Sequence, residues 1–357
     1  MSDERDTSHM ERALTNAASV QGLTAPNPWV GCVVALADGR TVDGVTHPAG
    51  GPHAEAHALE QLGGAAQGAT LYVTLEPCAH HGRTPPCTDA IIAAGVERVV
   101  VAIEDPDPNV GGRGVAALRA AGIAVEIGSM AGEATRLLAP YLTHRRTGRP
   151  SVVLKLAATL DGRTAAPDAT SRWITGPEAR ADVHRLRAAS DAILVGAGTV
   201  RDDDPALTVR GVESPLPGIV HEPLRVVLGH APPDARVHPA VEMSGDLGEV
   251  LDELGRRGVL QLLVEGGPTV AGAFHRAGLV DHYVVYLAPA LFGGDDARPL
   301  FTGAGASTID ALWRGSVAGI ERFGDDLRID LHPLPADTTH GVPDGSASTR
   351  LEEEIPT

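Results

Sequence analysis

The segment His53-Ala54-Glu55, followed by Pro77-Cys78 and then Pro86-Cys87, constrains the fold of this chain more than any other feature. One imidazole and two thiolates form a ligand set that suits Zn²⁺. To bind one ion, three side chains from different segments must come together. Three protein ligands leave the fourth zinc position open, and Glu55 can move protons while zinc activates a water. The pattern predicts a catalytic zinc site with ligands His53, Cys78 and Cys87 and with Glu55 as the acid–base group.

The three ligands are expected at the ends of regular elements. A helix is predicted over 53–62, after a Gly-Gly-Pro break, and a second helix over 88–94 begins just behind Cys87. The β-branched and aromatic run 69–75 predicts a buried strand that ends shortly before Cys78. The partial positive charge at a helix N-terminus favours thiolate, so we expect it to help hold the cysteines deprotonated.

Simpler interpretations of these residues exist. A lone H-x-E triplet is common at positions that bind nothing, and cysteines are often small buried apolar residues. Cys78 and Cys87 could form a disulfide, but no secretory signal is evident and cytosolic thiols stay reduced. The joint pattern, with a proline before each ligand, favours zinc in a cytoplasmic protein. Cys32, within the apolar run 30–34, is predicted to be a core residue of the first strand.

The order of apolar and glycine-rich segments predicts an α/β fold with two domains. Helical and strand patterns alternate, and glycines such as Gly95, Gly122 and Gly278 stand where a helix ends and a strand begins. The polar and basic stretch 143–150 is typical of a linker. We therefore predict a disordered N-terminus over 1–9, a first domain over 10–144, a linker over 145–150, a second domain over 151–332 and a disordered tail over 333–357.

The overall charge limits the class of partner. The formal net charge of −17 argues against a nucleic-acid binder, which would carry a basic face. No apolar run approaches the length of a membrane span. We expect neither nucleic acid nor membrane as a partner, and a small molecule as the substrate.

At the zinc motif the chain resembles the cytidine-deaminase-like zinc deaminases. Those typically carry P-C-x-x-C, whereas here eight residues separate Cys78 from Cys87. The whole string TLEPCAHHGRTPPC, and PNPWVGCVV from Pro26, resemble the family of bifunctional riboflavin-biosynthesis deaminase/reductases. The resemblance continues with KLAATLDGRTA from Lys155 and VEGGPTVAGAF from Val264. It implies a cytidine-deaminase-like layered domain followed by a dihydrofolate-reductase-like α/β domain.

The resemblance also implies the chemistry. The first domain would deaminate 2,5-diamino-6-(5-phosphoribosylamino)pyrimidin-4-one with one catalytic zinc ion. The second would use NADPH to reduce the ribosyl group, giving 5-amino-6-(5-phosphoribitylamino)uracil. A homodimer through the reductase domain is expected by resemblance alone. In the deaminase, the positions that match substrate contacts of the family are Asn27, His47, His80 and Arg83. Asn and His can read heterocycle edges and Arg83 can meet a phosphate, although Asn27, between two prolines, could merely shape a turn.

The second half of the chain has fewer motifs that by themselves indicate its chemistry. No G-x-G-x-x-G fingerprint follows a strand; instead, Gly196-Ala197-Gly198 and Gly266-Gly267-Pro268 each follow an apolar run. Such small residues let a backbone approach phosphates, although tight turns use glycine in the same way. The family often has an acid where this chain has Gly229, and the segment 237–247 is shorter than usual. The resemblance therefore implies no cofactor contact from Gly229.

Matching positions imply two sets of contacts in the reductase. Those to NADPH would come from Ala157, Trp173, Thr199, Asp203, Gly267, Pro268, Thr269, Val270, Ala271, Gly272 and Ala273. Those to the substrate would come from Ser171, Arg187, Leu207, Arg210 and Glu265. Arg187 and Arg210 are candidate clamps for the 5′-phosphate, because guanidinium groups bind phosphate with two parallel hydrogen bonds.

Lys155 is the only lysine of the chain, since every other Lys/Arg position holds arginine. Lysine is a compact, titratable charge, whereas arginine is larger and stays protonated. A chain that uses arginine so uniformly retains lysine by chance or where arginine cannot serve. Lys155 lies in an otherwise apolar strand, and we hypothesise that it acts in the reductase pocket near the ribose.

Two rival functions differ from this interpretation. The first is a nucleoside or tRNA deaminase whose second domain is not a reductase. The long gap between Cys78 and Cys87, the acidic charge and the matched second half count against it. The second is a non-catalytic zinc module or nucleotide-binding partner protein, which would have no need of Glu55.

Overall fold

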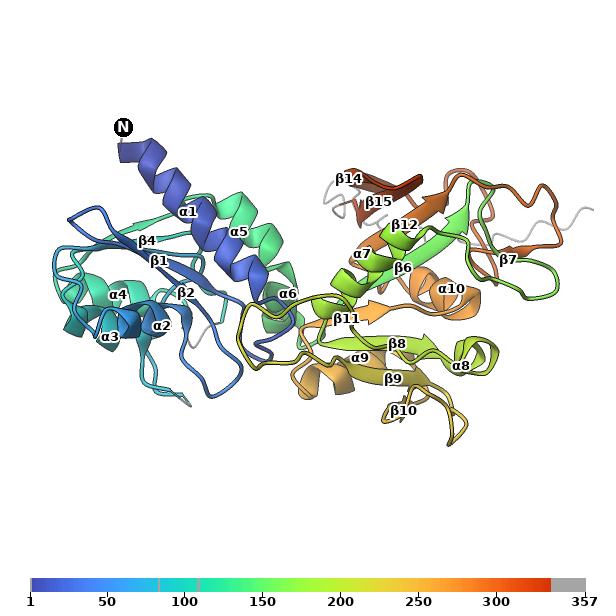
Figure 1. The fold of residues 1–357 in the computed structure, drawn as a ribbon, viewed down its shortest axis with the longest axis horizontal. Helices are drawn as coiled ribbons and strands as arrows, with labels where there is room; N and C mark the ends of the chain where they lie inside the picture. The colour runs from blue at the N-terminus through green and yellow to red at the C-terminus, as the bar shows by residue number, and fades with distance from the viewer. Residues whose placement is uncertain (1, 83, 108–109, 335–357) are drawn as a thin grey trace, which may run out of the picture.

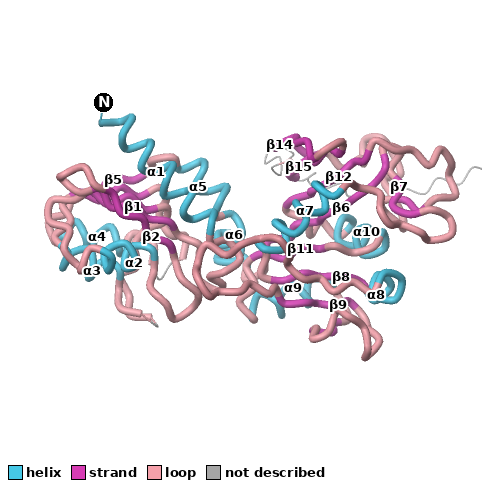
Figure 2. Tube along the Cα trace, in the orientation of Figure 1, coloured by secondary structure: helices cyan, strands magenta, loops and turns pink. Residues whose placement is uncertain are grey.

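Each half of the chain folds around a β-sheet of its own, with helices on both faces of the sheet (Figures 1 and 2). The structure is a computed structural model that describes residues 2–82, 84–107 and 110–334. Within this described part, no helix is both long and apolar enough to span a membrane. The layered α/β arrangement predicted from the alternating pattern is confirmed in both halves.

The first half is a five-stranded sheet with the order β2-β1-β3-β4-β5. β1 pairs antiparallel with β2 and β3, whereas β3, β4 and β5 run parallel. Its elements are α1 (Ser2–Ser19), β1 (Gly31–Ala35), β2 (Thr41–Val45), α2 (Ala54–Gln61), β3 (Thr70–Val73), α3 (Cys87–Ala94), β4 (Arg98–Val101), α4 (Arg113–Ala120), β5 (Ala124–Ile127), α5 (Ala131–Leu137) and α6 (Ala139–Thr147).

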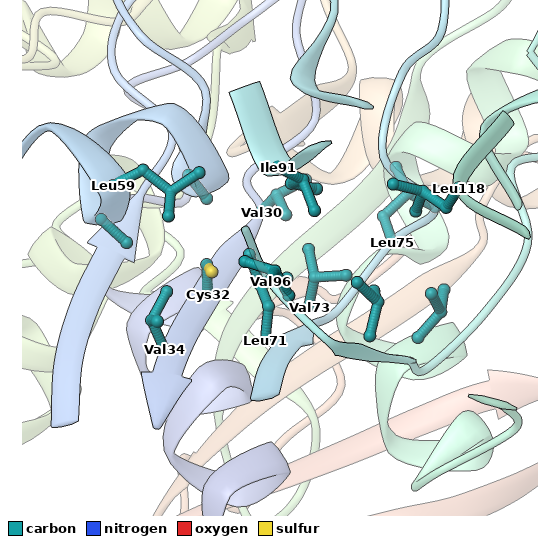
Figure 3. Packing of buried hydrophobic residues seen from close by; sticks show 14 of the residues in the cluster. Val30, Cys32, Val34, Leu59, Leu71, Val73, Leu75, Ile91, Val96 and Leu118 are labelled. Carbon is teal, nitrogen blue, oxygen red and sulfur yellow. The ribbon is translucent and has the colours of Figure 1, made fainter. Parts of the chain in front are cut away.

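Alternate residues of these strands point to opposite faces, so the sheet has an apolar cluster on each side. On one face, Val33 and Tyr72 pack against α1 and α5. On the other, Cys32, Leu71 and Val73 pack against α2, α3 and α4 (Figure 3). Cys32 has no exposed surface, so its prediction as a core residue of the first strand is confirmed.

The second half is an eight-stranded sheet with the order β10-β9-β8-β11-β6-β12-β15-β14. The strands from β10 to β12 run parallel, and β15 and β14 continue the sheet antiparallel. A small ribbon, β13 with β7, lies beside it. The elements are β6 (Ser151–Thr159), β7 (Arg163–Ala165), α7 (Pro177–Ala188), β8 (Ala192–Gly196), α8 (Ala197–Asp203), β9 (Leu224–Leu228), β10 (Val241–Met243), α9 (Leu247–Arg256), β11 (Gln261–Val264), α10 (Pro268–Arg276), β12 (His282–Ala288), β13 (Arg298–Pro299), β14 (Gly315–Phe323) and β15 (Asp326–Pro333).

The parallel part of this sheet determines where a ligand can bind. Helices α9 and α10 cover one face and α7 covers the other, and their apolar residues form two clusters on the strands between them. The carboxyl ends of β6, β8 and β11 meet at one edge. Ligands of open α/β sheets bind at such an edge.

The two ends of the first domain differ from the sequence-based prediction. Residues 2–9, expected to be disordered, belong to helix α1. Asp6 forms an ion pair with Arg98 at 2.7 Å and accepts a hydrogen bond from the Tyr72 hydroxyl, and Met10 is fully buried. These contacts order a segment whose polar composition suggested disorder, because they come from strands far along the chain.

The predicted linker over 145–150 is also wrong in part. Helix α6 continues to Thr147 and ends at Gly148, whose φ of 75° makes it a left-handed C-cap. Tyr141 and Leu142 bury one side of this helix, so its polar last turn remains helical. Only residues 148–150 connect α6 to β6. The predicted disordered tail lies, from residue 335 onward, outside the described residues.

Candidate functional site

The structure brings His53, Cys78 and Cys87 together, with their ligand atoms all within 4.8 Å of one another. His53 is the N-cap residue of α2, Cys78 follows β3, and Cys87 is the first residue of α3. The Nδ1 atom of His53 lies 3.6 Å from the Cys78 sulfur and 3.4 Å from the Cys87 sulfur. Tetrahedral zinc with ordinary bond lengths separates nitrogen and sulfur ligands by about 3.6 Å. The three residues therefore fit a zinc ion.

The N-terminus of α3 stabilises negative charge at the Cys78 sulfur, whereas the hydrogen bond to Cys78 and burial raise the pKa of the Cys87 thiol. The backbone N–H of Cys87 donates to the Cys78 sulfur at 3.4 Å, and that of Thr88 donates to the Cys78 carbonyl at 3.2 Å. A hydrogen bond from the Cys87 thiol, together with the His53 imidazole, lowers the pKa of Cys78 to about 4. Thiolate, not thiol, is the form that ligates zinc.

Glu55 lies in the first turn of α2, two residues after His53, and is only 3% exposed. Burial, with the nearby Cys78 thiolate as a further cause, raises the pKa of the Glu55 carboxyl to about 7. A divalent cation held beside it would offset part of that shift. A buried carboxylate that is next to three metal ligands is suited to carry protons.

Glu76 anchors the segment that carries Cys78. Its side chain is 4% exposed and accepts hydrogen bonds from the backbone N–H groups of Gly112 at 2.9 Å, Val115 at 3.0 Å and Asp105 at 3.3 Å. The carboxylate thus ties the end of β3 to the N-terminus of α4. Sequence reasoning did not select this residue, although an acid just before the Pro-Cys pair was a visible signal.

Replacing Glu76 with Ala is expected to destabilise the first domain by about 2–4 kcal/mol, because three buried backbone donors lose a charged acceptor. Thermal unfolding followed by circular dichroism measures this change. We also expect a lower zinc content, measured by atomic absorption. Glu97→Ala is a suitable comparison, since Glu97 is exposed; equal stability of the two variants would contradict an anchoring role.

The four predicted substrate contacts of the first domain differ in their position and in their exposure to solvent. His47 lies next to the segment that carries His53, since the backbone N–H of His47 donates to the Pro52 carbonyl at 3.0 Å. Its Nε2 atom is buried without a hydrogen-bond partner in the described structure, as expected of a group that awaits a ligand. Asn27 is half-buried in a turn closed by Thr24, and His80 is exposed. Arg83 lies outside the described residues, so all four contacts stay predictions.

In the second domain, two adjoining pockets of about 780 and 720 Å³ open at the carboxyl ends of the strands. Lys155, Trp173 and Thr199 line both, so the pockets form one continuous cleft. All five predicted substrate contacts line the first pocket: Ser171, Arg187, Leu207, Arg210 and Glu265. Its size and its guanidinium groups suit a phosphorylated small molecule.

The second pocket brings together most of the predicted NADPH contacts: Ala157, Trp173, Thr199, Asp203, Gly267, Pro268, Thr269 and Val270. The Thr199 hydroxyl accepts a hydrogen bond from the Gly267 N–H at 3.1 Å, which joins α8 to the start of α10. Ala271, Gly272 and Ala273 do not line either pocket; they belong to the next turn of α10, and Ala271 is fully buried.

Gly229 ends β9 with a φ of 104°, and a Cβ there would lie 3.0 Å from the Cβ of Ala197. The left-handed φ and the close approach both disfavour a side chain. This geometry suits the glycine that the chain has at this position.

An ion pair between Arg187 and Glu265 lies at the inner end of the first pocket. Nε and Nη2 of Arg187 donate to the two carboxylate oxygens at 2.6 and 2.9 Å, and Nη1 donates to the Thr208 carbonyl at 3.1 Å. The side chains are 13% and 9% exposed. Burial opposes ionisation of Glu265, yet the Arg187 charge holds the pKa of Glu265 below its usual value. These bonds use three of the five N–H donors of Arg187, so the residue braces the pocket wall, and its contact with a phosphate stays a prediction.

Sequence reasoning missed one face of α7. Arg180, His184 and Arg187 follow one another at helical spacing and all line the first pocket. Arg180 also lies over the Trp173 ring, with 4.5 Å between its guanidinium carbon and the ring centroid. That spacing was the signal in the sequence, but only Arg187 was selected.

Two family profiles together match most of the chain. The cytidine and deoxycytidylate deaminase zinc-binding region matches residues 3–103, and the RibD C-terminal domain matches residues 150–329. Riboflavin biosynthesis protein RibD of Escherichia coli is 43% identical over 92% of this chain and 99% of its own length. The protein of that name from Mycobacterium tuberculosis is 44% identical over 90% and 96%, respectively.

Solved structures of RibD proteins are also similar to this chain over most of its length. One form of Acinetobacter baumannii RibD superposes with a TM-score of 0.86 at 38% identity, covering 93% of this chain and 100% of that one. A Thermotoga maritima protein described as a diaminohydroxyphosphoribosylaminopyrimidine deaminase/5-amino-6-(5-phosphoribosylamino)uracil reductase has a TM-score of 0.82 at 34% identity, covering 94% and 100%. The likeness spans both sheets of the molecule.

Proposed function

Because this chain belongs to the RibD family, we propose that it carries out two successive steps of riboflavin biosynthesis. The first is hydrolytic deamination of 2,5-diamino-6-(5-phosphoribosylamino)pyrimidin-4-one, and the second is reduction of the ribosyl side chain with NADPH. Bound zinc supplies the Lewis acidity that turns water into a nucleophile near neutral pH. NADPH supplies the hydride. The match of residues 150–329 to the RibD C-terminal domain argues against the rival function, in which the second domain is not a reductase.

The observation that carries the deaminase assignment is the cluster of three zinc ligands beside a buried carboxylate. His53, Cys78 and Cys87 would hold the ion. Glu55 would take one proton of the attacking water and deliver it to the ring nitrogen. It would then take the second water proton from the hydroxyl group added to the ring and deliver it to the departing ammonia, so that its carboxylate is regenerated. His47 supports the pyrimidine through its unpartnered Nε2 atom. Asn27, His80 and Arg83 are proposed as further substrate contacts on the strength of the resemblance.

In the reductase, the first pocket would hold the pyrimidine ribotide and the second would hold NADPH. Arg210 is exposed at the first pocket and forms no ion pair among the described residues, so it is free to bind the 5′-phosphate. Arg187 would hold Glu265 and the pocket wall, and its two remaining N–H donors would contact the substrate. Lys155, where the two pockets meet, would lie between substrate and cofactor.

Lys155→Arg is expected to lower reductase kcat/KM by about 10-fold or more, a loss of about 1.4 kcal/mol for each tenfold. Burial lowers the pKa of Lys155, although Glu265 acts in the opposite direction. Arginine keeps the charge but neither the compact shape nor the titration. Steady-state NADPH oxidation with deaminated substrate measures the effect, and ammonia release by the same preparation is the internal control. Full reductase turnover would defeat the assignment.

We further propose a homodimer through the reductase domain in the cytoplasm, with no nucleic acid or membrane partner. An apolar surface on the edge of the second sheet supports the dimer, since Val317 and Ile320 of the edge strand β14 are 58% and 62% exposed. A monomer mass in sedimentation equilibrium would contradict it.

A further inference from the structure

The connection between β8 and β9 is an unusual feature of the second domain. These strands are parallel neighbours, so the chain must return from the carboxyl end of β8 to the amino end of β9. Helix α8 contributes only seven residues, and residues 204–223 contain no helix or strand. Irregular loops of this length inside a compact domain usually serve a function.

The first part of this loop forms a wall of the substrate pocket. Asp204, Leu207 and Arg210 line the pocket together with the residues between 204 and 207. Leu207 is 3% exposed and has a φ of 50°. A branched side chain rarely adopts this left-handed conformation, which persists only where the surroundings hold it. The Thr208 carbonyl accepts a hydrogen bond from Arg187, so this wall also touches the buried ion pair.

The later part of the loop belongs to the other domain's core. Leu216 is 5% exposed and lies in the apolar cluster formed by α2, α3, α4 and their sheet, and Ile219 packs against the same cluster. Apart from Leu260, the remaining buried members of that cluster come from residues 20–142. Figure 1 shows this part of the loop, in yellow-green, between the two domains near α6, and Figure 2 shows it as a loop.

The end of the loop is fixed as well. His221 Nε2 lies 2.8 Å from the Ser190 carbonyl, which holds the chain as it enters β9. The first part of the loop therefore lines the reductase pocket, and the later part packs in an apolar cluster made mostly of deaminase residues. Leu207 in the first part and Leu216 in the later part are buried. The residues that line the NADPH pocket do not include any of residues 204–223.

We propose that Leu216 and Ile219 are positioning residues, which hold the substrate wall of the reductase by anchoring loop 204–223 to the deaminase domain. The proposal rests on the reductase function assigned above. When the anchor is lost, Leu207 can relax from its left-handed conformation and Arg210 loses its fixed place. Substrate binding must then order the loop. The apparent affinity for the ribotide falls in proportion to the fraction of molecules whose pocket wall already has the binding-competent conformation. NADPH binding does not involve the loop and stays unchanged.

The test is Leu216→Ala in the full-length, zinc-loaded enzyme, assayed with the deaminated ribotide and NADPH. We expect KM for the ribotide to rise about 3- to 10-fold, with KM for NADPH within about 2-fold of wild type. Val220→Ala is the matched control, because Val220 lies in the same loop and is 83% exposed. Leu216→Met, which conserves volume, should restore the wild-type KM.

Three results would overturn the proposal: unchanged KM values, an equal rise for ribotide and NADPH, or the same effect from Val220→Ala. If Leu216→Ala fails to fold, Ile219→Ala decides by the same criteria. Amide hydrogen exchange of residues 207–210 gives a readout without substrate, and it should be faster in the Leu216 variant than in wild type. If wild type itself does not oxidise NADPH, the reductase assignment fails, and the exchange experiment alone decides whether the anchor orders the loop.

Discussion

Glu55→Gln is expected to lower kcat for deamination by about 10²- to 10⁴-fold while zinc stays bound. The amide fills the same buried space next to His53 but cannot accept the proton of water or return it to the ring and the leaving ammonia. The three ligand atoms do not include Glu55, so the ion should remain. Ammonia release measures the loss, atomic absorption measures the zinc, and NADPH oxidation with deaminated substrate should be unchanged.

Glu60→Gln is the matched control for this variant, because Glu60 is on the same helix α2 and is exposed. It should release ammonia at the wild-type rate. Normal ammonia release by Glu55→Gln, with zinc retained, would remove the acid–base role and would favour a non-catalytic zinc module.

The second large effect is expected from breaking the buried ion pair of the reductase. Glu265→Leu leaves the Arg187 guanidinium buried without its acid, and such a change costs about 3–5 kcal/mol. The unfolding transition of the second domain should fall in temperature, and reduction should be lost because both residues line the substrate pocket. Differential scanning calorimetry and NADPH oxidation measure the two effects, and deamination should be retained.

The double variant Arg187→Leu/Glu265→Leu separates stability from function. Removing both charges leaves no buried unpaired ion, so we expect most of the lost stability to return. Reduction should still be absent. A double variant as unstable as Glu265→Leu would show that the pair stabilises the domain through its geometry rather than through charge compensation. A double variant that still reduces its substrate would show that the pair has no role in the reductase site.

The zinc cluster could be predicted from the sequence because each ligand lies next to a local signal. A proline precedes His53, Cys78 and Cys87, and the helices and strand around them have strong propensities that the structure reproduces to within about two residues. The reductase residues could be proposed only from the resemblance, since glycines at strand ends also suit ordinary turns. The structure then placed all five substrate positions in one pocket.

What the sequence could not reveal depends on contacts between distant segments. Helix α1 begins at Ser2 because Arg98 and Tyr72 hold Asp6, and this pairing has no local signature. The same is true of Leu216, a loop residue that lies in an apolar cluster made mostly of residues from the other domain. The helical spacing of Arg180, His184 and Arg187 is visible in the sequence. It indicates a binding site only when α7 is known to border a pocket, and the structure shows that it does.

We propose that the two domains act in sequence on one substrate. The most direct test supplies wild-type protein with the diaminopyrimidinone ribotide and NADPH together, and follows ammonia release and NADPH oxidation in the same sample. Both are expected, with one NADPH oxidised for each ammonia released and no oxidation before deamination. Release of ammonia with NADPH untouched would contradict the reductase assignment, and oxidation of NADPH without ammonia would contradict the order of the two steps.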